Sequence, residues 1–142
     1  MVLVADSSNI VDYAFEPRMQ LVGYGDPVQT FAAKYASEWQ VLTFDFTNAL
    51  LSPNLLVNVL GIVVTCSIGN DPDPQAILLG APSINSSPIT KLNGAIIAVG
   101  NAVSQAVKGG VPGATYVIEV NCGTNQQYVQ PTCAGVLPIL TP

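Results

Sequence analysis

The chain has 142 residues, of which 49% are hydrophobic and only 9% charged, and its four basic and nine acidic residues give a net charge of −5. This length fits a single domain. The acidic balance argues against nucleic acid and anionic membranes as partners, because both are bound through clustered lysine and arginine. Since average soluble domains are roughly 25% charged, much of this surface is expected to be buried against partner proteins.

The first 36 residues show no clear strand pattern, and residues 28–35 have weak helical character. From Trp39 onward, short β-type runs alternate with proline, glycine and asparagine clusters. This pattern predicts an N-terminal arm, residues 1–36, followed by an all-β, immunoglobulin-like antiparallel sandwich of about seven strands, residues 37–142. The terminus at residues 1–6 lacks the basic segment and long apolar stretch of a signal peptide, so synthesis and assembly in a cytoplasm are expected.

The first predicted strand, residues 41–46, alternates, with Leu42 and Phe44 on the core face and Asp45 on the solvent face. The longest, residues 56–68, is almost continuously apolar, which predicts burial on both faces or a bulge at Gly61. It is too short to cross a membrane as a helix, which takes about 20 apolar residues.

The prolines at 82 and 88 predict short edge strands between residues 77 and 89. Asn93-Gly94 predicts a hairpin turn, followed by strands that end near Val107. Residues 116–122 alternate cleanly, and a final strand within 126–138 is interrupted by two prolines, as edge strands are. Tyr116 is expected either to return its hydroxyl to the backbone, as in a tyrosine corner, or to be an ordinary core aromatic residue.

Residues 34–38 (Lys-Tyr-Ala-Ser-Glu), residues 44–50 (Phe-Asp-Phe-Thr-Asn-Ala-Leu) and the Gly109-Gly110 turn before the Tyr116 strand resemble small immunoglobulin-like structural proteins of tailed bacteriophages. Those proteins lie around the neck and the attachment region of the tail fibres. The resemblance spans roughly residues 34–130, and the N-terminal extension and proline-rich C-terminus depart from it. It implies a virion structural protein, assembled in the host cytoplasm as a homo-oligomer that contacts neck, tail or fibre subunits.

The residue types for common catalysis are missing, because the sequence contains no histidine to act as the base of a Ser-His or Cys-His pair. Asp71 and Asp73 could in principle form a carboxylate pair or bind calcium, but their two flanking prolines favour a turn. No enzymatic activity, cofactor or metal is therefore expected. The three cysteines, at 66, 122 and 133, are expected to be buried free thiols, and a Cys66–Cys122 bridge is the alternative.

The expected function is that of an adaptor whose sandwich supplies a rigid body and whose N-terminal arm clasps neighbouring subunits by strand addition. Deletion of residues 1–33 is accordingly expected to leave a folded module. The alternatives are a capsid decoration protein and an adhesion or carbohydrate-binding module, which would cluster Tyr24, Tyr35, Trp39 and Tyr128 on exposed loops. The candidate partner contacts are the apolar and aromatic residues of the arm: Val2, Leu3, Val4, Phe15, Tyr24, Phe31 and Tyr35.

Overall fold

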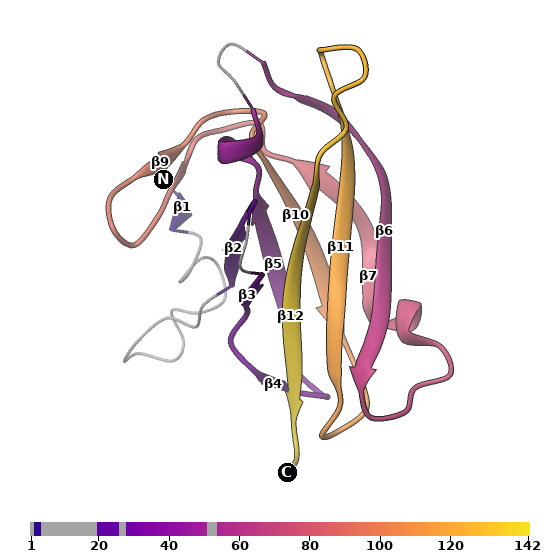
Figure 1. The fold of residues 1–142 in the computed structure, drawn as a ribbon. Coiled ribbons are helices and arrows are strands. Elements are labelled where there is room, and N and C mark those ends of the chain that lie inside the picture. The colour runs from indigo at the N-terminus through magenta and orange to yellow at the C-terminus, as the bar shows by residue number, and fades with distance from the viewer. Residues whose placement is uncertain (1, 4–19, 26–27, 51–53) are drawn as a thin grey trace.

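The chain is an all-β sandwich, as the sequence predicts (Figure 1). The computed structural model describes residues 2–3, by their backbone, together with residues 20–25, 28–50 and 54–142. The described strands are β1 (Val2–Leu3), β2 (Leu21–Gly23), β3 (Gln29–Thr30), β4 (Lys34–Tyr35), β5 (Trp39–Asp45), β6 (Leu56–Ile68), β7 (Leu78–Ile84), β8 (Ile89–Thr90), β9 (Ile96–Ile97), β10 (Ala102–Lys108), β11 (Thr115–Thr124) and β12 (Thr132–Leu140). Two 3-10 turns, η2 (Thr47–Ala49) and η3 (Pro74–Ile77), connect them.

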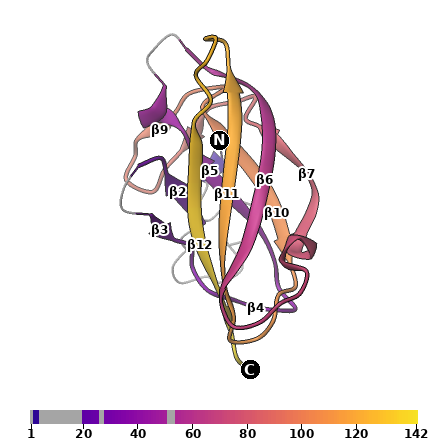
Figure 2. The same cartoon turned by 45° about the vertical axis from the view of Figure 1, so that its right-hand side comes forward.

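Two main sheets form the sandwich. The front sheet has the order β3-β12-β11-β6, with β4 also paired to β12, and the back sheet has the order β2-β5-β10-β7. The two sheets face each other along their length, as the turned view in Figure 2 shows. A small third sheet, β1-β8-β9, consists of the β8–β9 hairpin, which projects beside the back sheet, and of β1, which pairs in parallel with β8.

The main core lies between the front and back sheets and follows the predicted alternation. The inward side chains of β11 (Tyr116, Ile118, Val120 and Cys122) and of the β5 region (Leu42, Phe44 and Phe46) are fully buried. A satellite cluster of Leu21, Ile89, Ile97 and Ala102 packs the β8–β9 hairpin onto the outer side of the back sheet. Burial of this apolar surface is the main source of stability for such a fold.

Part of the predicted arm belongs to the sandwich. Residues 28–35 are not helical, because β3 and β4 run along β12, and β2 runs along β5, all in parallel. Val22 and Phe31 are buried in the main core, and the Phe31 ring meets the Phe44 ring edge-on with their centroids 5.4 Å apart. Gly135 of β12 lies directly under the Phe31 ring, where any larger side chain would clash. Deletion of residues 1–33 would therefore remove core side chains, contrary to the sequence-based expectation.

Asp45 also departs from its predicted place on a solvent face, since only 4% of it is exposed. Its Oδ1 accepts hydrogen bonds from the backbone N–H of Thr47 at 2.9 Å and from the Thr47 hydroxyl at 2.5 Å. Its Oδ2 pairs with the Lys91 ammonium at 2.9 Å, from the β8–β9 hairpin. The carboxylate thus fixes the end of β5 and ties the hairpin to the back sheet.

Two of the three segments that carry the family resemblance, residues 34–38 and the Gly109-Gly110 turn, meet at one end of the sandwich, whereas residues 44–50 lie at the opposite end of β5. The buried Lys34 ammonium donates to the carbonyl of Gly109 at 2.7 Å and to that of Tyr35 at 3.1 Å. The Gly109 N–H in turn donates to the carbonyl of Ala36 at 2.9 Å, and Glu38 accepts from the Tyr35 N–H at 2.7 Å. Carbonyl partners of this kind offset the cost of burying an ammonium group.

Tyr116 makes a tyrosine-corner type of contact. Its hydroxyl accepts from the Val111 N–H at 2.9 Å and donates to Asp71 Oδ2 at 2.6 Å. Burial, followed by the hydrogen bond to Asp71, raises the pKa of Tyr116 to about 12, and the hydrogen bond from Tyr116 is the main cause that lowers the pKa of Asp71. The contact joins the β6–β7 loop, the turn before β11 and the core.

We expect Phe31→Ala to lower the free energy of unfolding by about 3–5 kcal/mol, because it empties a filled part of the core. Tyr35→Ala is the control: that side chain lies four positions along the same segment and is 43% exposed, so a change within about 0.5 kcal/mol is expected. Urea unfolding of both variants measures this. Equal effects would contradict the placement of Phe31 in the core.

Tyr116→Phe is expected to cost about 1–2 kcal/mol at neutral pH, because the Val111 N–H loses its acceptor. The difference in unfolding free energy from wild type should shrink as the pH falls below about 4. Because the pKa of Asp71 is lower in the folded than in the unfolded protein, its hydrogen bond to Tyr116 stabilises the fold only while the carboxylate is ionised, and protonation removes this stabilisation. The difference should also shrink as the pH rises from about 10 towards 12. Because the pKa of Tyr116 is higher in the folded protein, its protonated hydroxyl stabilises the fold at lower pH, and this stabilisation is lost as the hydroxyl ionises. Denaturant unfolding from acid to alkaline pH tests this, with Tyr128→Phe, at a ring that is 89% exposed, as the control that should show no such profile.

Candidate interaction surface

The outer face of the front sheet carries several exposed apolar residues in the described part of the chain. Strands β3, β6, β11 and β12 contain one charged residue among them, Glu119. Because inward and outward positions alternate, Glu119 and Asn121 of β11 point outward, beside apolar side chains of the neighbouring strands. The exposed large apolar residues of this face are Leu60 (46% exposed), Val63 (56%), Ile68 (62%) and Leu140 (38%).

Strand β6 provides much of this face because it lies at the edge of the front sheet. The prediction that residues 56–68 are buried on both faces is wrong, since only Leu56 and Val64 of the strand are buried. The alternative, a bulge at Gly61, is close to what is found: Val59 pairs with Cys122 and Gly61 with Asn121, so that Leu60 has no partner in the register. The bulge turns Leu60 onto the outer face.

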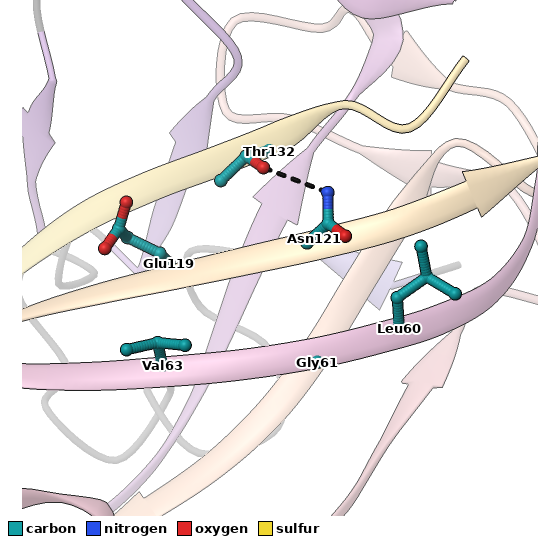
Figure 3. Close-up of a pocket in the computed structure, with 6 residues that line it drawn as sticks. All are labelled: Leu60, Gly61, Val63, Glu119, Asn121 and Thr132. Atoms are coloured by element: carbon teal, nitrogen blue, oxygen red, sulfur yellow. Dashed lines mark hydrogen bonds between the residues drawn. The ribbon is translucent and has the colours of Figure 1, made fainter. Parts of the chain in front are cut away.

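A shallow hollow of about 300 Å³ lies on this face, where Gly61 leaves a gap between larger side chains (Figure 3). It is lined by Leu60, Gly61, Val63, Glu119, Asn121 and Thr132. The Asn121 amide is held in place, since its Nδ2 donates to Thr132 Oγ1 at 3.0 Å. A Cβ atom added at Gly61 would meet no atom within 4 Å, so a larger side chain at this position would have room to extend into the hollow. The lining therefore combines apolar side chains with two polar residues and one acidic residue, Glu119.

The free edge of β6 is closed in its middle by a side chain. Gln75, from η3, accepts a hydrogen bond from the Val64 N–H through Oε1 and donates to the Ile62 carbonyl through Nε2 at 3.1 Å. These are the two groups that a further strand would use, so the glutamine amide stands in for a neighbouring peptide group. It blocks strand addition at this point of the edge.

A second, smaller apolar surface lies on the β8–β9 hairpin. Leu92, Ile96 and Val99 are 55%, 66% and 46% exposed. The base of the hairpin is fixed by Asn85, whose Oδ1 accepts from the N–H groups of Gly100 and Ala102, both at 3.0 Å. The predicted Asn93-Gly94 turn is present, with Gly94 at φ +89°.

The structure places the sequence-predicted contact residues apart from one another. Phe31 is 1% exposed and faces the core, whereas Tyr24 and Tyr35 are 37% and 43% exposed. The backbones of Val2 and Leu3 pair with β8. Val4 and Phe15 lie outside the described residues. The outer face of the front sheet was not predicted as a contact surface, although the uncharged run of residues 56–68 was the available signal.

The aromatic residues expected of a carbohydrate-binding module do not form one cluster. Tyr35 and Trp39 flank the turn between β4 and β5, while Tyr128 lies on the β11–β12 loop at the opposite end of the sandwich (Figure 1). Tyr24, which follows β2, bonds through its N–H to the carbonyl of Asp45. Tyr24 therefore lies at the opposite end of β5 from Trp39.

All three cysteines are free thiols; Cys122 and Cys133 are buried and Cys66 is half-buried. Burial raises the pKa of Cys122 and of Cys133 to about 12, so both are protonated at neutral pH. Within the described residues, no group of three or more cysteine, aspartate and glutamate side chains is placed to hold a metal ion. That part of the chain also holds no helix of the length and hydropathy needed to span a bilayer.

No protein-family model, curated protein or solved structure matches the chain.

We expect Gln75→Ala to expose the Val64 N–H and the Ile62 carbonyl and so to promote edge-to-edge pairing of β6. The variant should form dimers or larger species at concentrations where the wild type does not, and the Val64 amide should exchange its hydrogen faster. Light scattering after size exclusion and amide hydrogen exchange measure these effects. Gln127→Ala, at an exposed glutamine of the β11–β12 loop, is the control; the same association in both variants would contradict the role given to Gln75.

Proposed function

We propose that the chain is a non-enzymatic virion structural protein of a tailed bacteriophage, an oligomeric adaptor in the neck or tail region that joins fibres or neighbouring subunits to the particle. The observation that carries the proposal is the outer face of the front sheet, where Leu60, Val63 and Ile68 are each between 46% and 62% exposed. Several exposed large apolar residues on one face of a folded domain are typical of a site of protein contact. The proposal assigns this face to the neighbouring subunit.

The rigidity of the sandwich supports an architectural role. The front sheet is held by the long β6–β11 and β11–β12 pairings, which span most of the length of each strand. The face therefore has a fixed shape before any partner binds, and a preformed surface loses little conformational entropy on association. A joint between subunits requires such a surface.

The virion role in this proposal rests on the family resemblance. Its lead-in, residues 34–38, and its glycine turn, residues 109–110, are distant in sequence but are linked through Lys34 in space. Short motifs that lie in unrelated parts of a chain carry more weight when they form one structural unit. The unit fixes the start of β5 and the turn before β11.

The proposal predicts that the protein is a fixed-stoichiometry component of purified phage particles and that Val63→Glu removes it from them. The new carboxylate lies on an exposed position and leaves the core intact, but it puts a charge in the contact. We expect at least a tenfold loss of incorporation, measured by quantitative mass spectrometry of particles from the phage that encodes the chain.

Leu92→Glu is the matched control, because it adds the same charge at a residue of the β8–β9 hairpin that is 55% exposed. It should incorporate as wild type does. Absence of the wild-type protein from the particles would refute the virion role, and normal incorporation of Val63→Glu would refute the assignment of the front-sheet face.

A further inference from the structure

Glu119 lies in the middle of the apolar face rather than at its rim. Its two cross-strand neighbours are Val63 on β6 and Ala134 on β12, and it is one of the residues that line the hollow above Gly61. Among the described residues, no cation lies within ion-pair distance of it. A lone carboxylate that becomes covered by a partner is costly unless the partner neutralises it.

A second copy of this chain is a poor source of that neutralising charge. If two front sheets packed around a two-fold axis through this face, they would bring the two Glu119 carboxylates towards each other. The copies also repel at longer range, because each carries a net charge of −5. Of the three described cations, Lys34 is buried, Lys91 is paired with Asp45, and Lys108 is exposed at the end of β10 in the back sheet, not in the front sheet. The complementary charge is therefore more readily supplied by a different, more basic chain.

We propose that the partner of this face is an extended segment of another protein that places a lysine or arginine against Glu119 and an apolar side chain in the hollow above Gly61. This inference rests on the proposed function and names the chemistry of its partner. In an extended segment, side chains two positions apart point the same way. One apolar residue and one basic residue with a single residue between them can thus occupy the hollow and its acidic wall together.

The experiment uses the full chain and three capped nine-residue peptides. In each peptide, valine alternates with threonine, and the central valine is replaced by lysine, glutamate or glutamine. Binding is followed by NMR titration of the backbone amides. The lysine peptide should shift the amide signals of Gly61, Val63, Glu119 and Asn121. At low salt it should bind about fivefold more tightly than the glutamate peptide, which is the size of effect that an exposed charge pair produces. The preference should vanish at about 1 M salt, where such pairs are screened.

Two variants separate the two parts of the site. Glu119→Gln should abolish the preference for lysine over glutamate but keep the apolar binding, whereas Asp73→Asn, which removes an exposed carboxylate elsewhere, should change neither. Gly61→Val should fold normally, because its Cβ meets no atom within 4 Å, and should weaken all three peptides about tenfold by filling the hollow.

Equal affinity for the lysine and glutamate peptides, shifts confined to another surface, or the absence of measurable binding would overturn the inference. So would full binding by Gly61→Val. None of these outcomes bears on whether the protein is a component of phage particles, which the incorporation assay decides by itself.

Discussion

The alternation of β11 is the constraint on which the rest of the structure depends. Its inward residues, from Tyr116 to Cys122, form the centre of the core and pair on both sides with β6 and β12. Since successive residues of a strand point to opposite faces, the same register places Glu119 and Asn121 on the outer surface. The core and the proposed contact site are therefore two faces of one strand. A shift of one residue in the register would bury the carboxylate and expose the core.

The N-terminal segment completes the sandwich from the other side. Phe31 covers Gly135 of β12, and the Lys34 ammonium closes the end where the Gly109 turn leads into β11. Strands β3 and β4 of this segment pair in parallel with β12, which lies about 100 residues later in the sequence. These pairings use the edge that the antiparallel β6-β11-β12 sheet provides, and they close long loops at a cost in conformational entropy. The segment is thus an integral part of the fold.

Sequence patterns predicted the strands whose environment is local. Residues 56–68 are a strand within the predicted bounds, Tyr116 to Cys122 share the predicted face, and Asn93-Gly94 forms the predicted turn. The patterns failed where the neighbours are distant in sequence. The exposure of Val63 depends on the outer face of the front sheet being uncovered, and the buried Asp45 carboxylate pairs with Lys91 from the projecting hairpin. Neither fact is encoded in the alternation of a single strand. The hollow above Gly61 likewise needs β11 and β12 beside it.

Strand β6 contains no charged residue, although it lies at the edge of the front sheet. Edge strands of isolated domains commonly carry a lysine, a proline or an inward-pointing charge that prevents pairing with other chains. Strand β6 has thirteen residues and none of these devices, and Gln75 closes only the part around Ile62 and Val64. A single charge at Val57 or Leu60, which are 53% and 46% exposed, would cost little stability. The lack of charge on β6 agrees with the proposal that this surface contacts another subunit, and in that proposal Glu119 distinguishes the correct partner from the wrong ones.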